Sequence, residues 1–326
     1  MRRRQFLGLV GGAAFGLPKA VAQEPLPRVG FLASGAAASI GSAAQVATLK
    51  HGLQDNGLVD GRDYIFEVRF SGGHYDQFPE LARELAQAGA RVILVNTIAS
   101  ARAAQNLVPP VAVVMMSIND PVGMGLIASL ARPGDHTTGM ASLNEDLTPK
   151  LIEFQRSILP KATLIGALHN PANPTNLAFL KSLGEYAGAL GMRAISIPVS
   201  SRAELEAAFA ALPPQRPDAL LVVADSGLFD LSDRIAALAL MQRLPTFSTS
   251  PDFVKFGGLI AYGASREKLW LRATSYVKRI LDGADPGDLP VEQPSKIELW
   301  INLKTAKALG LTIPAALLGI ADEVIE

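Results

Sequence analysis

The sequence predicts an α/β protein made of two lobes, each a doubly wound parallel sheet, with a hinge between them. The main observation is that short apolar, β-branched segments alternate with longer segments of helical periodicity, a pattern typical of βαβ units. The alternation occurs twice, over residues 28–115 and again over 147–242. The length of 326 residues agrees, because one domain usually takes roughly 100–200 residues.

The first series alternates strands and helices in the order of a doubly wound sheet. Val92–Val95 is continuously apolar, as a central parallel strand covered on both faces should be. Asn56 and Gly57 form a C-cap signal that ends the first helix. The expected strands are 28–32, 64–70, 92–95 and 111–115, and the expected helices are 43–54, 78–88 and 99–107.

The second series repeats the same alternation after a boundary that we expect near residues 140–145. Pro160 stops its first helix, and Pro213 with Pro214 stops its third. The expected strands are 163–168, 193–197 and 219–223, and the expected helices are 147–158, 175–190, 202–211 and 231–242.

The remaining C-terminal residues do not form a third unit. Strands are expected at 259–262 and 297–301, and helices at 266–281 and 304–308. A tail of this kind should return to complete both sheets, and a chain that crosses several times between lobes makes a hinge. We therefore expect lobe I to comprise residues 28–142 plus about 250–283, and lobe II to comprise 143–249 plus about 284–326.

Residues 1–22 have the features of an export signal. Three arginines at positions 2–4 precede an apolar run from Phe6 to Leu17, and Ala20-Val21-Ala22 supplies a small-residue cleavage site. The apolar run is shorter than the ~20 residues that span a bilayer. Arg3–Leu7 also resembles the twin-arginine export motif, and the choice between the twin-arginine and general secretory routes stays open. We expect cleavage after about Ala22 and a periplasmic mature chain.

Composition excludes several classes of protein. The chain has 30 basic and 30 acidic residues, and loss of the leader, which holds four basic residues, leaves a net charge of −4. A mildly acidic chain does not favour nucleic acid. The absence of cysteine excludes disulfides, thiolate metal sites, cysteine nucleophiles and lipid attachment through cysteine. No later segment is apolar over the ~20 residues that span a bilayer, so we expect no direct membrane insertion of the mature chain.

The sequence contains no recognisable catalytic or cofactor-binding motif. Gly123–Ala128 matches G-x-G-x-x-A, but it follows the fourth strand rather than the first, and Asp120-Pro121 interrupts what should be a tight turn. There is no nucleophile elbow, P-loop or H-E-x-x-H motif. The four histidines are scattered, although His169, at a strand end, could face a cleft. We therefore expect no enzyme activity, no catalytic residue, no metal and no cofactor.

Polar residues follow the expected strands at their carboxyl ends, where open α/β sheets bind ligands. Hydroxyl and amide groups at helix N-termini suit a carboxylate or another anion. Asp120 and Asp225, one from each lobe, could hold an ammonium group, and Tyr262 could form an aromatic wall. Roles as helix caps, turn residues or core side chains stay open for most candidates. The candidate ligand-binding residues are Ser34, Gly35, Asn96, Thr97, Asp120, Asn170, Asp225, Ser226 and Tyr262.

Characteristic segments are spread along nearly the whole chain. They include Asp120–Gly123, Asn170–Pro174 and Phe256–Leu259, and most specifically Leu289–Pro294 and Asn302–Leu311. These segments resemble the bacterial substrate-binding proteins of ABC transporters that share the type I periplasmic-binding fold. The resemblance implies that two lobes close on a small, amino-acid-like or carboxylate-bearing solute and deliver it to a membrane permease.

Two other functions stay open beside the periplasmic solute-binding component of an ABC transporter. The same scaffold could carry a secreted enzyme, with a reactive pair in the cleft such as His169 and a carboxylate. It could also be a ligand sensor that reports to a membrane kinase. In the favoured function, a hinge closes on the ligand and the closed form is the one that the permease recognises.

Overall fold

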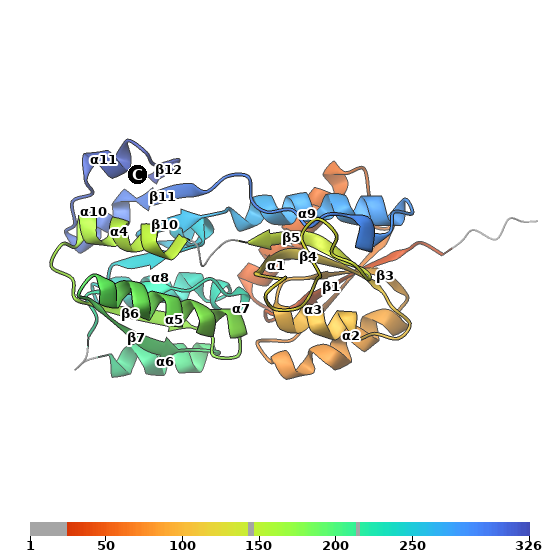
Figure 1. Cartoon of the computed structure of the whole chain (residues 1–326), viewed down its shortest axis with the longest axis horizontal. Helices are drawn as coiled ribbons and strands as arrows, with labels where there is room; N and C mark the ends of the chain where they lie inside the picture. Colours follow the sequence, from red (N-terminus) through yellow and green to blue (C-terminus); the bar gives the residue numbers. More distant parts are fainter. Residues whose placement is uncertain (1–24, 143–146, 213–215) are drawn as a thin grey trace, which may run out of the picture.

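The computed structural model describes residues 25–142, 147–212 and 216–326. Figure 1 shows two lobes beside each other, each with a central sheet covered by helices. The predicted fold class is confirmed, because both sheets are predominantly parallel and alternate with helices along the chain. The expected signal peptide of residues 1–22 lies outside the described residues. Among the residues described, no helix combines the length and apolar character needed to cross a membrane.

Lobe I is built on a five-stranded parallel sheet with the strand order β2-β1-β3-β4-β5. Helix α2 shows why helices cover this sheet. Phe78, Ala82 and Leu85 recur at helical spacing and are all buried, so they form the single apolar face of an amphipathic helix. The elements are β1 (Arg28–Ala33), α1 (Ile40–Asp55), β2 (Ile65–Phe70), η1 (Tyr75–Gln77), α2 (Phe78–Gln87), β3 (Ala90–Val95), α3 (Ile98–Gln105), β4 (Ala112–Asn119) and β5 (Thr137–Ser142).

Lobe II is built on a seven-stranded sheet with the order β12-β11-β10-β9-β8-β6-β7, in which β10 and β11 are antiparallel. Its first elements are α4 (Thr148–Ile158), β6 (Leu164–His169), α5 (Pro174–Ala189), β7 (Arg193–Pro198), α6 (Arg202–Ala211), β8 (Ala219–Val222), α7 (Ser226–Phe229), α8 (Ser232–Met241) and β9 (Thr246–Ser248). Its later elements are η3 (Pro251–Phe256), β10 (Ile260–Gly263), β11 (Glu298–Asn302), α10 (Leu303–Leu309), α11 (Ala315–Leu318) and β12 (Glu323–Ile325).

Helix α9 (Arg266–Leu281) returns from lobe II to lobe I, where it lies beside α1 (Figure 1). Trp270 of α9 is buried and meets Phe31 of β1 edge-on, with ring centroids 5.8 Å apart. The short helix η4 (Pro286–Asp288) follows, and Leu289 and Val291 are buried in the cores of lobe I. The tail therefore contributes both to the core of lobe I and to the sheet of lobe II.

The crossing points differ from the expected ones. The sequence placed about 250–283 in lobe I, but β10 pairs with β9 and β11 in lobe II. The sequence placed 284–326 in lobe II, but residues up to Val291 pack on lobe I. Strand pairing and core packing decide these positions, and neither is a local property of the sequence. Gly263, next to the first crossing, is tightly constrained, because a Cβ there would lie 1.9 Å from the carbonyl oxygen of Thr249.

Strands β5, β9 and β12 and helices α7 and α11 were not expected from the sequence. Strand β5 lacks an apolar run, and Gly139 inside it has φ 125°. A Cβ on Gly139 would lie 2.1 Å from the carbonyl oxygen of Met115, so glycine lets β5 approach β4 closely. The other four elements are too short to show a period.

Candidate functional site

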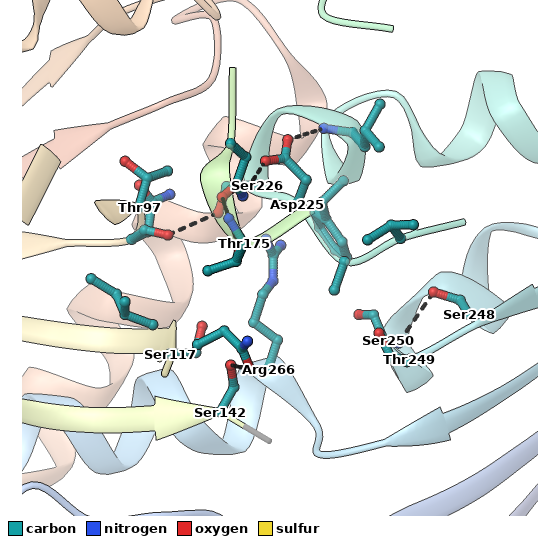
Figure 2. A pocket seen from close by; sticks show the side chains of 18 of the residues that line it. Thr97, Ser117, Ser142, Thr175, Asp225, Ser226, Ser248, Thr249, Ser250 and Arg266 are labelled. Atoms are coloured by element: carbon teal, nitrogen blue, oxygen red, sulfur yellow. Dashed lines mark hydrogen bonds between the residues drawn. The ribbon is translucent and has the colours of Figure 1, made fainter. Parts of the chain in front are cut away.

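A pocket lies between the lobes, at the carboxyl ends of strands from both sheets, where open α/β sheets place their ligands. Lobe I contributes the ends of β3, β4 and β5, and lobe II contributes the residues after β8 and β9. In Figure 2, Thr97, Ser117 and Ser142 face the pocket from one side, and Arg266 points into its middle. The space between its lining atoms is about 840 Å³, a figure that includes open solvent at its mouth.

Arg266 is the first residue of α9 and brings a positive charge into this pocket. Its guanidinium carbon lies 3.2 Å from the ring centroid of Phe229 and 4.8 Å from that of Trp270, a cation–π arrangement. No carboxylate of the described residues forms an ion pair with it. Burial lowers the pKa of Arg266 to about 10, against the opposing effect of nearby aspartates. The guanidinium is therefore charged at neutral pH and has N–H groups to offer a ligand.

Asp225 organises the wall opposite lobe I. Its Oδ1 accepts hydrogen bonds from the N–H groups of Gly227 and Leu228 in α7, at 2.8 and 3.1 Å, and from Asn170 Nδ2 at 3.2 Å. Its Oδ2 accepts Asn173 Nδ2 at 2.8 Å and the hydroxyl of Tyr75 at 3.4 Å. A carboxylate has about four acceptor positions, so these donors occupy it. Asp225 thus orders the pocket wall and is not a free acceptor for an ammonium group in this arrangement.

Hydroxyl and amide groups supply the other polar atoms of the pocket. Thr97 caps α3 through a reciprocal capping box with Ser100. Asn96 Oδ1 and Thr249 Oγ1 are buried and have no hydrogen-bond partner among the described residues. Such buried groups normally find a partner. Among the described residues, the pocket lining therefore presents the cation of Arg266 and two buried side-chain oxygens without a hydrogen-bond partner.

Hydrogen bonds between the lobes close the pocket. Ser226 Oγ donates to the carbonyl of Asn96 across 3.2 Å. Tyr75 from lobe I donates to Asp225 and accepts from Asn170, both of lobe II, each across 3.4 Å. The structure is therefore a closed arrangement of the two lobes.

Four of the nine predicted residues line the pocket: Asn96, Thr97, Asp225 and Ser226. Their contact with a ligand stays a prediction. Ser34 lies behind Asn96, whose Nδ2 donates to Ser34 Oγ at 3.3 Å. Asn170 lies behind Asp225 and supports it. These two residues can hold the pocket wall without lining it.

Gly35, Asp120 and Tyr262 lie outside the pocket lining. Gly35 lies against Asp230 of lobe II. Asp120 is exposed with φ 42°, and its carboxylate accepts a backbone N–H three residues later at 2.9 Å, so it serves a turn. Tyr262 packs edge-on against Phe154 at 5.3 Å in the core of lobe II. The aromatic residues that line the pocket are Phe229 and Phe253 instead.

Sequence reasoning missed Arg266 and Phe229. A signal for Arg266 was present, because a positive charge in the first turn of a helix opposes the helix dipole and calls for another explanation. Phe229 belongs to α7, which is too short to be recognised. The polar segments Ser117–Asn119 and Ser248–Ser250 also reach the pocket.

His169 does not form a reactive pair with a carboxylate. Its Nε2 lies 2.8 Å from Ser196 Oγ, but neither residue lines the pocket between the lobes. Burial lowers the pKa of His169, and Nδ1 has no hydrogen-bond partner among the described residues. The orienting third group of a catalytic triad is thus missing from this part of the structure. Nor do the described residues contain a group of three metal-ligating side chains.

Comparison with known proteins agrees with this architecture. A tyrosine-binding protein of Clostridioides difficile (strain R20291) is 26% identical over 260 residues, which cover 79% of this chain and 74% of the relative. Among solved structures, a Streptococcus pneumoniae ABC domain in complex with L-Trp has 23% identity and a TM-score of 0.79, covering 92% of this chain and 100% of that one. A ligand-free, open substrate-binding protein from Clostridium difficile has 22% identity and a TM-score of 0.61, covering 92% and 99%.

The family described as ABC transporter substrate binding protein matches residues 40–325. This range includes the pocket, the C-terminal segments and every strand of both sheets except β1. The chain therefore belongs to the family of ABC transporter substrate-binding proteins.

Proposed function

We propose that this substrate-binding component captures an amino acid in the pocket between its lobes. The observation that most supports this proposal is that Arg266 brings a charged guanidinium into the pocket without an ion-pair partner among the described residues. Guanidinium groups bind carboxylates with two parallel hydrogen bonds. The ligand's carboxylate would lie against Arg266, and hydroxyl groups such as that of Ser117 would complete its hydrogen bonds.

The other groups of the pocket suit the rest of an amino acid. Asn96 Oδ1, buried without a partner among the described residues, can accept a hydrogen bond from an ammonium group. Phe229, Leu228 and Ile98 offer apolar surface to a side chain. The tyrosine-binding and L-Trp-binding relatives support an aromatic amino acid as the first candidate.

Closure of the hinge is the proposed capture step. The TM-score of 0.79 to the L-Trp complex exceeds the 0.61 to the open, ligand-free protein, which supports a closed arrangement here. A ligand that contacts both lobes binds the closed form more tightly and so shifts the population toward it. The permease of the transporter would then receive solute from the closed form.

Export of the chain to the periplasm is part of the proposal. The leader of residues 1–22 has the basic, apolar and small-residue parts of a signal peptide. Its Arg3-Arg4 pair also resembles the twin-arginine motif. The chain that remains carries no cysteine for lipid attachment, which supports a freely diffusing receptor.

A binding screen of residues 23–326 tests the ligand class. Each of the common amino acids, a set of sugars and a set of dicarboxylates would be added in a thermal-unfolding assay, and hits would be measured by calorimetry. We expect an amino acid at 100 times its dissociation constant to add about 2.7 kcal/mol to the free energy of unfolding. Stabilisation by a sugar, with none by any amino acid, would contradict the proposal.

A further inference from the structure

Asp230 ends α7 of lobe II and lies against the first turn of α1 in lobe I. Gln45 Nε2 donates to Asp230 Oδ1 across 3.0 Å. A Cβ built on Gly35 would lie 1.9 Å from Asp230 Oδ2 and 2.4 Å from Ser42 Oγ, and one built on Gly41 would lie 2.7 Å from Asp230 Oδ1. The two glycines therefore leave the space that the carboxyl group occupies when the lobes are closed.

This contact leaves polar atoms buried without a partner among the described residues: Asp230 Oδ2, Ser42 Oγ and Gln45 Oε1. Ser42 is 0% exposed and Gln45 is 3% exposed. A buried carboxylate with an unpaired oxygen is unfavourable. A protonated carboxyl group carries an O–H that can donate a hydrogen bond. Ser42 Oγ and Asp230 Oδ2 both lie close to the position that a Cβ of residue 35 would occupy.

We propose that Asp230 is a proton-linked latch between the lobes, whose protonation favours the closed arrangement and whose ionisation favours opening. The inference rests on the hinge motion of the proposed function. It concerns the regulation of that motion and not the identity of the ligand.

The electrostatic surroundings of Asp230 favour its protonated form in the closed arrangement. Burial raises the pKa of Asp230 to about 6; Arg266 of α9 opposes the shift and Asp225 adds to it. Tyr75 of η1 faces the same region, and Asp230 helps to raise the pKa of Tyr75. The side chains that α1 presents here, Ser42 and Gln45, are uncharged. Arg266 is the cation that acts on Asp230, and its effect does not cancel that of burial.

The sign of the pH dependence follows from proton linkage. In the open arrangement the carboxyl group returns to water and to its ordinary pKa of 3.8, whereas closure raises that pKa to about 6. The closed form therefore binds more protons, so the contribution to closure is complete below the ordinary pKa and is lost as the pH rises through about 6. The ratio of closed to open molecules should be about tenfold higher at pH 5 than at pH 7.5.

Distance measurement between spin labels on the two lobes tests the latch in ligand-free protein. The chain has no cysteine, so Gln77→Cys and Arg202→Cys, both at exposed positions, place one label on each lobe of residues 23–326. We expect the short-distance population to grow about tenfold, relative to the long-distance one, from pH 7.5 to pH 5. Asp230→Asn should remain closed at both pH values, and the exposed Asp233→Asn should behave as the unsubstituted chain.

Gly41→Ala is a second variant that does not depend on the folding of Asp230→Asn. Alanine is more favourable than glycine inside a helix, but its Cβ would occupy the space of Asp230 Oδ1, so this variant should stay open at both pH values. A distance that changes with an added amino acid but not with pH would overturn the latch alone. A distance that changes with pH but with no amino acid would overturn the ligand class and leave the latch supported. A distance that changes with neither would also overturn the latch.

Discussion

Replacing Arg266 with methionine tests the proposed ligand carboxylate site most directly. Methionine keeps an unbranched side chain over Phe229 but removes the charge and the N–H donors. Because the guanidinium forms no ion pair with the described residues, its loss breaks no ion pair of the ligand-free fold there. We therefore expect the variant to fold and to lose affinity for the ligand.

The size of the loss follows from the bonds removed. A hydrogen bond to a charged group contributes about 1.5–3 kcal/mol, so affinity should fall by roughly 10- to 150-fold. At a ligand concentration of 100 times the dissociation constant of the unsubstituted chain, a 100-fold loss reduces the stabilisation from about 2.7 to about 0.4 kcal/mol.

Titration calorimetry with L-tryptophan and L-tryptophanamide separates the carboxylate from the rest of the ligand. The unsubstituted chain should prefer the acid, whereas Arg266→Met should bind both compounds with similar, weak affinity. Arg272→Met is the matched control, because Arg272 is on the same helix and pairs with Glu292 away from the pocket. If Arg266→Met binds L-tryptophan with an affinity within twofold of that of the unsubstituted chain, the role given to Arg266 is refuted.

Two further predictions concern closure and export. Tyr75→Phe removes the hydroxyl group that forms hydrogen bonds with Asp225 and Asn170 across the lobes. Ligand affinity should therefore fall about two- to tenfold, with little change in the melting temperature of the ligand-free chain. Unchanged affinity in calorimetry would show that these hydrogen bonds do not stabilise closure. If the leader uses the twin-arginine route, the double variant Arg3→Lys with Arg4→Lys should remain inside the cell as the precursor, as measured by cell fractionation. Normal export of the double variant would assign the chain to the general secretory route.

Much of the site could be anticipated because parallel strands bring their carboxyl ends to one edge of each sheet. Thr97 and Ser226 follow strands in this way, and both reach the pocket. Tyr262 also lies near a strand end, but its side chain points to the core of lobe II and contacts Phe154. Side chains alternate between the two faces of a strand, and the face that meets the pocket depends on which neighbouring strands pair.

The sequence alone established the alternation of elements, because helix caps, turn residues and hydrophobic periodicity are local properties. It did not show that β10 stays in lobe II while α9 crosses to lobe I, since that depends on pairing and packing between distant segments. The same crossing carries Arg266 into the pocket. Contact between the lobes likewise decides the environment of Asp230, which meets α1 about 185 residues earlier in the chain. Those features required the tertiary structure, because burial and charge around a side chain arise only when separate segments meet.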